Sequence, residues 1–223
     1  MGQYYYPTLM GSRYGIKGWL YSHEYDNGLK LMEHSYMGNR FVNVVLAQIH
    51  NNPMRLAWMG DYADDWGDEP TQEPYTTKLP RNRFMKIFDN VVGDNGDNRS
   101  HKISPKVGME FEGPEDFSGW YLINHTQQTF LDLGKYAEEN FWEEEWNGRT
   151  YKCAVHPLPL LTACGNGRGG GDYHDCYPDY DKVGTWAFDV IELTDCRPVG
   201  FKEEHYGFTE ERKVTDDDCD RAL

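Results

Sequence analysis

The chain lacks several features that mark whole classes of protein. It has no run of about 18 apolar residues, the length that crosses a membrane, and its N-terminus has no charged-then-apolar signal pattern. Its five cysteines are an odd number without a CxxC pair, which argues against a disulfide framework and favours reduced thiols. We therefore expect a cytoplasmic protein with no membrane partner.

Basic residues are also scarce. Lysine and arginine number 22 against 37 aspartates and glutamates, so the formal net charge is −15. Proteins that bind DNA or RNA rely on a basic patch, and this chain has no lysine- or arginine-rich cluster, so we expect no nucleic-acid partner. The acidic stretches 61–69 and 137–145 each carry a tryptophan, and they favour a solvated acidic face over imitation of nucleic acid.

The apolar pattern of several segments predicts regular structure. Residues 39–50 place apolar side chains on one helical face, with Asn39 as the N-cap. Residues 54–62 alternate as a strand, and residues 118–124 and 128–133 favour a hairpin. The sum indicates an α+β fold with a mostly antiparallel sheet and two or three short helices.

The elements of the second half have weaker signals. Residues 135–146 favour a short acidic helix, and residues 150–163 favour an edge strand interrupted by two prolines. Residues 184–194 alternate as a strand, and residues 199–208 are expected to return beside it.

Composition sets the expected domain boundaries. Residues 63–82 and 90–117 are rich in acids, proline, glycine or asparagine, which indicates exposed loops rather than domain linkers. We expect a single domain over residues 1–213 and a flexible acidic tail over residues 214–223.

The segment 165–171, called the glycine loop below, carries five glycines around one arginine. Such a cluster implies unusual backbone angles or close approach of the backbone to another group. Successive amides and an arginine together suit an anion, although a set of tight turns is the alternative. The segment is not a Walker loop, because it has no Gly-Lys-Ser/Thr sequence followed by a helix. It is not a dinucleotide-binding fingerprint either, because no helix opens after the glycines. The predicted ligand-binding residues are Gly165, Asn166, Gly167, Arg168, Gly169, Gly170, Gly171, Asp172, Tyr173 and Trp186.

Titratable residues gather near this loop in the sequence. They suit a general acid and base or a cation, but their spacing matches no metal motif, so no metal site is predicted. Asp189 lies among apolar residues and needs a partner, for which Arg168 is the expected one. The group comprises His156, Asp172, His174, Asp175 and Asp189, and the candidate catalytic residues within it are His174, Asp172 and His156.

Several blocks of the chain resemble uncharacterised proteins of tailed phages and gut bacteria. The blocks are Met1–Pro7, Gly28–Ser35, Trp58–Ala63, His156–Ala163 and Gly165–Tyr173. The resemblance spans most of the chain and implies a phage-associated accessory protein that works in the host cytoplasm. It implies no activity, cofactor or site residue.

Three functional hypotheses follow. The first is a small-molecule binding protein that captures a phosphate-bearing, nucleotide-like ligand, with Tyr173, Trp186 or Trp120 stacked on a base, and so sequesters a host nucleotide signal. The second is a hydrolase that cleaves a nucleotide or glycosidic bond with a His/Asp site. The third is an acidic inhibitor that binds a host protein. The sequence names no cofactor, and it leaves a homo-oligomer open.

Overall fold

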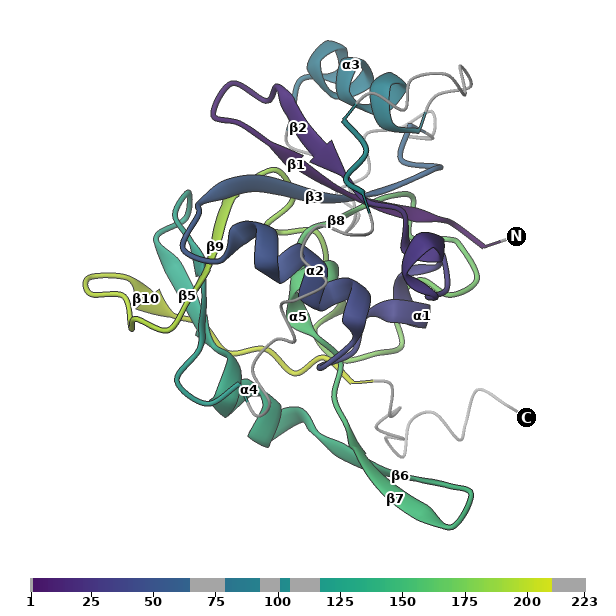
Figure 1. The fold of residues 1–223 in the computed structure, drawn as a ribbon, viewed down its shortest axis with the longest axis vertical. Helices are drawn as coiled ribbons and strands as arrows, with labels where there is room; N and C mark the ends of the chain where they lie inside the picture. The colour runs from purple at the N-terminus through teal and green to yellow at the C-terminus, as the bar shows by residue number, and fades with distance from the viewer. Residues whose placement is uncertain (1, 65–78, 93–100, 105–116, 210–223) are drawn as a thin grey trace.

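A mixed sheet forms the centre of the molecule in this computed structural model, which describes residues 2–64, 79–92, 101–104 and 117–209 (Figure 1). The strand order is β10-β5-β4-β9-β3-β1-β2, and β8 pairs with β3 beside β9. All pairs are antiparallel except β10 with β5 and β8 with β3. The strands are β1 (Tyr5–Met10), β2 (Ile16–Trp19), β3 (Met54–Gly60), β4 (Tyr121–Asn124), β5 (Thr129–Asp132), β8 (Ala163–Cys164), β9 (Val190–Thr194) and β10 (Lys202–Glu203).

Helices cover both faces of the sheet, and a separate hairpin projects from the body (Figure 1). The described residues contain α1 (Leu31–His34), α2 (Arg40–Ile49), α3 (Arg81–Val91), α4 (Leu133–Asn140) and α5 (Pro157–Leu161), with short 3₁₀ turns at Ser22–Tyr25 and Tyr180–Lys182. The hairpin consists of β6 (Trp142–Trp146) and β7 (Arg149–Cys153). The predicted α+β class with a mostly antiparallel sheet is confirmed, although the helices outnumber the two or three expected.

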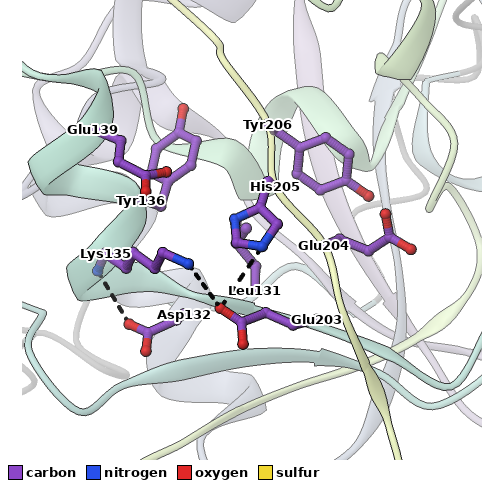
Figure 2. Close-up of a pocket in the computed structure, with 9 residues that line it drawn as sticks. All are labelled: Leu131, Asp132, Lys135, Tyr136, Glu139, Glu203, Glu204, His205 and Tyr206. Carbon is purple, nitrogen blue, oxygen red and sulfur yellow. Dashed lines mark hydrogen bonds and ion pairs between the residues drawn. The ribbon is translucent and has the colours of Figure 1, made fainter.

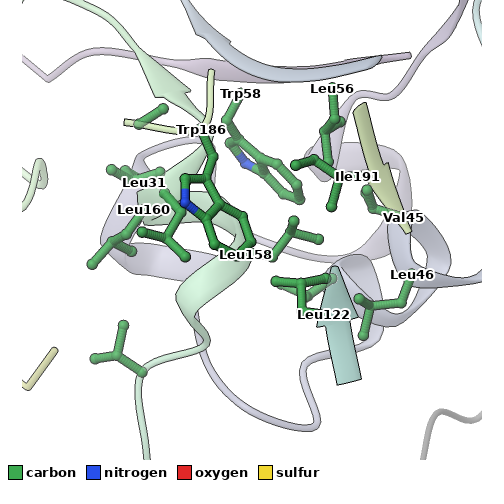
Figure 3. Close-up of a cluster of buried hydrophobic side chains, with 14 of the residues drawn as sticks. Leu31, Val45, Leu46, Leu56, Trp58, Leu122, Leu158, Leu160, Trp186 and Ile191 are labelled. Carbon is green, nitrogen blue, oxygen red and sulfur yellow. The ribbon is translucent and has the colours of Figure 1, made fainter. Parts of the chain in front are cut away.

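The central strand β3 divides the apolar core in two. Its side chains alternate as predicted, with Leu56 and Trp58 on one face and Ala57 and Met59 on the other. The first face packs against α1, α2 and α5, where Trp58 and Trp186 lie among leucines (Figure 3). The second face packs against α3. A strand buried on both faces must be apolar at every position, which residues 56–59 are.

Helix α2 begins where its cap predicts. The Asn39 side chain accepts hydrogen bonds from the backbone N–H groups of Phe41 (2.8 Å) and Val42 (3.3 Å). These are donors that the first helical turn cannot satisfy internally. The predictions for residues 39–50, for the strand from residue 54 and for the hairpin of β4 and β5 are therefore confirmed.

A buried histidine links the helical layer to β3. The Trp58 Nε1–H donates to Nε2 of His34 at 2.9 Å, and His34 Nδ1 lies 3.0 Å from the carbonyl oxygen of Gly28. A carbonyl only accepts, so Nδ1 carries the proton and the ring is neutral. Burial lowers the pKa of His34 to about 4.

Helix α3 is missing from the sequence-based prediction, which ends one loop at residue 82 and begins another at residue 90. The helix has an apolar face at helical spacing, formed by Phe84, Ile87, Phe88 and Val91. Most of residues 63–82 and 90–117, and all of the predicted tail at 214–223, lie outside the described residues.

The predicted helix over residues 135–146 is wrong in its second half. Helix α4 ends at Asn140, and residues 142–146 form β6 instead. The Asn147–Gly148 turn explains the difference, because both residues adopt the positive φ of a tight hairpin turn and pair β6 with β7.

The predicted strand over residues 150–163 is right only as far as Cys153. Strand β7 ends at Cys153, and Pro157 opens α5 at a position where a helix needs no N–H donor. The strands expected over residues 184–194 and 199–208 shorten to β9 and β10.

Candidate functional site

The glycine loop packs against the chain's own N-terminal segment. The backbone N–H of Asn166 donates to Oε1 of Gln3 at 3.3 Å, and the Tyr5 hydroxyl donates to the same oxygen at 2.7 Å. A Cβ on Gly169 would lie 2.6 Å from the Gln3 backbone nitrogen, and one on Gly165 would lie 2.4 Å from Gln3 Oε1. The close approach that the glycines imply is therefore met within the chain itself.

The loop also holds an internal carboxylate. Asp172 is 1 % exposed, and its Oδ2 accepts a hydrogen bond from the Gly169 N–H at 2.9 Å. The Arg168 N–H donates to the side chain of Asn166 at 3.0 Å. These two amides therefore serve the loop's own side chains. Burial raises the pKa of Asp172 to about 6, against which the Gly169 hydrogen bond acts.

The buried Asp172 carboxyl predicts a pH-dependent effect of Asp172→Asn. Because its pKa rises from 3.8 to about 6 on folding, its contribution to stability is full below pH ~4 and is lost as pH rises through ~6. The asparagine keeps an acceptor for Gly169 and does not titrate. We expect its free energy of unfolding to exceed that of the wild type by roughly 2 kcal/mol at pH ~8 and to match it at pH ~4, measured by urea unfolding. A constant difference at both pH values would contradict this assignment.

Of the three aromatic residues predicted to stack on a ligand, Tyr173 and Trp186 lie in the core and Trp120 is half-buried. Tyr173 donates its hydroxyl proton to the carbonyl of Pro178 at 2.6 Å, and Trp186 packs edge-on against Tyr206. Tyr173 is 0 % exposed and Trp186 is 1 % exposed, so neither presents a ring face at the surface. Of the loop itself, Arg168 and Gly170 are exposed.

The titratable candidates have separate roles in the fold. His156 caps α5 through Nδ1, which accepts from the Leu158 N–H at 3.1 Å, and burial lowers the pKa of this ring to about 3. Helix α5 and β8 separate it in the chain from the glycine loop. His174 is half-buried and close enough to Asp172 to lower the pKa of that carboxyl, while Asp175 is exposed. Among the described residues no group of three or more His, Cys, Asp or Glu is arranged to hold a metal ion.

The expected pairing of Asp189 with Arg168 is replaced by amide contacts. Asp189 Oδ2 accepts hydrogen bonds from Asn124 Nδ2 at 2.9 Å and from Gln127 Nε2 at 2.7 Å. The hairpin turn between β4 and β5 supplies both amides, so the carboxylate ties this turn to the start of β9.

An acidic hollow lies between α4 and β10 (Figure 2). Lys135 Nζ lies 3.4 Å from Glu203 Oε1, and His205 lies 3.9 Å from the same oxygen. The hollow encloses no free volume. Lys135 and Glu203 pair across the hollow, which leaves no room for a ligand.

A cavity of about 340 Å³ with the opposite charge lies between α3 and the turn that joins β1 to β2. We call it the cationic cavity. Arg83, Lys86 and Asn90 come from one face of α3, where the helical repeat brings residues three and four apart together. The turn supplies Arg13 and Tyr14. The described residues that line the cavity are Arg13, Tyr14, Gly15, Ile16, Arg83, Lys86, Ile87, Asn90 and His101, and none of them is acidic.

The wall of the cationic cavity is built around Tyr14. The guanidinium carbons of Arg55 and Arg83 lie 4.4 Å and 5.1 Å from the centre of its ring. Arg55 is fixed in turn by a hydrogen bond of 2.9 Å to the carbonyl of Phe188. Tyr14 has a φ of 63°, and the hydrogen bond from the Gly11 N–H to the Gly15 carbonyl (2.9 Å) closes the turn around it. The wall is therefore preorganised.

Two cations of this cavity have side chains free for a ligand. Within the described part of the chain, neither the Arg13 guanidinium nor the Lys86 ammonium has a hydrogen bond or ion pair, and both residues are exposed. The chain has a net charge of −15, yet the described residues that line this cavity include cations and no acid, an arrangement that attracts anions. The sequence shows no such cluster, because residues 13, 55, 83 and 86 meet only in the folded chain.

The chain matches no protein-family model, no curated protein and no solved structure. Across the described residues, every helix is too short or too polar to cross a membrane. Their four cysteines, Cys153, Cys164, Cys176 and Cys196, are free thiols.

Proposed function

We propose that this protein binds a small, phosphate-bearing, nucleotide-like anion in the cationic cavity. The observation that carries the proposal is the convergence of Arg13, Arg83 and Lys86 on a cavity whose described lining residues include no acid. Phosphate oxygens accept charge-assisted hydrogen bonds from guanidinium and ammonium groups, and arginine can bind them with two parallel bonds.

The size and the lining of the cavity suit more than a bare phosphate. Its volume of about 340 Å³ lies in the range of small-molecule sites, which is about 300 to 1,000 Å³. Ile16 and Ile87 supply apolar surface, and Asn90 supplies an amide. An organic group attached to the phosphate would contact these three side chains while its phosphate meets Arg13 and Lys86.

The proposed role is capture without turnover. If the ligand is a host nucleotide signal, tight binding alone lowers its free concentration, as the resemblance to phage-associated proteins suggests. The hydrolase hypothesis needs His174, Asp172 and His156 to act together, but His156 and Asp172 are 0 % and 1 % exposed. Recovery of unchanged ligand after incubation would favour capture, whereas a cleaved product would favour the hydrolase.

Isothermal titration tests the proposal with inorganic phosphate, pyrophosphate, ADP, ADP-ribose and cyclic dinucleotides as probes. We expect at least one nucleotide to bind more tightly than inorganic phosphate. Lys86→Glu should weaken that binding by about tenfold to a hundredfold, because it replaces a charge-assisted contact with repulsion. Absence of heat with every probe would overturn the proposal.

Arg168→Glu is the matched control, since it makes the same change of charge on the glycine loop. This variant should bind as the wild type does if the ligand occupies the cationic cavity. If Arg168→Glu alone abolishes binding, the ligand occupies the glycine loop as the sequence predicts. Equal weakening by both variants would indicate only a general effect of net charge.

A further inference from the structure

The hairpin of β6 and β7 forms a sheet of its own that projects away from the body (Figure 1). In the described chain these two strands pair only with each other. An isolated two-stranded hairpin is marginally stable in water, and its two outer edges carry unpaired backbone groups. Exposed rings accompany it, with Phe141 at 43 % and Tyr151 at 42 % exposure. These properties are typical of a segment that pairs with another strand.

The turn determines which backbone groups point outward. Asn147 and Gly148 have φ angles of 52° and 71°, and Trp146 is opposite Arg149. In a two-residue hairpin of this kind the flanking pair exchanges hydrogen bonds, and every second pair does the same. The pair Glu145 and Thr150 therefore directs its N–H and C=O groups to the outer edges.

The outer edge of β6 opposes pairing with a second copy. A two-fold antiparallel pairing centred on Glu144 would set Glu144 against Glu144, and Glu143 against Glu145. Like charges directly opposite one another destabilise a sheet. None of the three glutamates has an ion pair within the described part of the chain, so all three charges would repel.

The outer edge of β7 has the opposite property. A two-fold pairing centred on Tyr151 sets Thr150 against Lys152 of the second copy, and Arg149 against Cys153. Thr150 and Lys152 are the residues whose backbone groups point outward, so their hydrogen bonds match. Tyr151 then faces Tyr151 in the close, non-hydrogen-bonded position, where aromatic pairs gain most. No like charges meet directly across this axis.

We propose that two copies of this protein associate through β7 and form a four-stranded antiparallel sheet in the order β6-β7-β7-β6. The edge is complementary to itself, which is the requirement of a two-fold interface. Because the hairpin projects from the body, it brings the strands together while the acidic bodies stay apart (Figure 1). This association is independent of ligand binding in the cationic cavity.

Light scattering coupled to size-exclusion chromatography tests the proposal across low to high micromolar protein. The wild type is expected to reach twice the monomer mass of 26.0 kDa. Thr150→Pro removes an outward N–H from β7 and should give a monomer. Glu145→Pro makes the same change directly opposite, on the outer edge of β6, and should leave the dimer intact.

The two proline variants also separate the interface from the stability of the hairpin, because both remove an N–H that β6–β7 pairing does not use. Tyr151→Glu provides a second route to the monomer, since it places two carboxylates at the axis. A wild type that stays monomeric at every concentration overturns the proposal. So does a dimer that Glu145→Pro dissociates and Thr150→Pro does not.

Discussion

Acidification from pH ~7 to pH ~4 is expected to destabilise the protein, because two buried histidines are held neutral. Burial lowers the pKa of His34 to about 4 and that of His156 to about 3, against 6.5 in the unfolded chain. Their contribution to stability is therefore full above pH ~6.5. It decreases as the pH is lowered, because these histidines bind protons in the unfolded chain and stay unprotonated in the folded chain. Each histidine costs about 1.4 kcal/mol per pH unit in this window. The combined loss by pH ~4 is on the order of 5 kcal/mol. Protonation of the buried Asp172 returns roughly 2 kcal/mol over the same range, so the net loss is about 3 kcal/mol, still a large part of the stability of a typical domain.

His156→Asn isolates one of the two contributions. Asparagine keeps an acceptor for the Leu158 N–H, which is the cap of α5, and it does not titrate. Circular dichroism during acid titration should show a lower unfolding pH for this variant than for the wild type. His205→Asn is the control, because His205 is exposed and should leave the midpoint where it is. Equal midpoints for both variants would refute the role of His156.

Gly169→Ala is expected to destabilise the fold by about 2 to 3 kcal/mol, the range of an overpacked core. The new methyl group would lie 2.6 Å from the Gln3 backbone nitrogen and 2.7 Å from Gln3 Cβ. Backbone cannot yield as the end of a flexible side chain can, so the first strand or the loop must shift. Urea unfolding at neutral pH measures the loss.

Gly170→Ala is the matched control one residue away. A Cβ at Gly170 would have no atom within 4 Å, and the φ angle of Gly170 is not positive, so alanine fits its backbone conformation. We expect a change within about 0.5 kcal/mol of the wild type, or a small gain from the stiffer unfolded chain. If Gly169→Ala folds as stably as Gly170→Ala, the glycines do not serve the packing of the N-terminal segment.

Local patterns were sufficient where one physical rule dominates. Asn39 followed by an apolar helical stripe predicts α2 and its first residue, because the cap and the stripe act in the same direction. The alternation of Leu56 and Trp58 with Ala57 and Met59 predicts a strand with these pairs on opposite faces, and the structure buries both faces. These elements needed no information from distant parts of the chain.

Other elements depended on signals that act against each other. Prolines at residues 157 and 159 argue against a central strand, but proline is also compatible with the first turn of a helix. The side chain of His156 caps that turn, which favours the helix. Residues 142–146 contain three glutamates, which favour a helix, but the hairpin turn at Asn147–Gly148 makes them a strand. Helix α3 had a usable signal in Phe84, Ile87 and Phe88, which the surrounding polar residues obscured.

The candidate sites divide in the same way. A need for close backbone approach follows from the glycines alone, but their partner is Gln3, which lies 163 residues before Asn166. Contacts between residues so far apart in the chain cannot be predicted from a local sequence pattern. The cationic cavity combines residues 13 and 83 through the packing of α3 on the sheet, so only the fold brings the charges together.

The contact between Gln3 and Asn166 has a consequence for synthesis of the chain. Strand β1 lies between β2 and β3, which follow it closely in the chain. The loop that covers its start emerges from the ribosome much later, because Asn166 lies 163 residues after Gln3. The start of β1 therefore stays partly exposed until the glycine loop has been made. Contacts between residues so far apart slow folding and extend exposure to aggregation. Residues made well before the glycine loop are therefore among the last to complete their contacts.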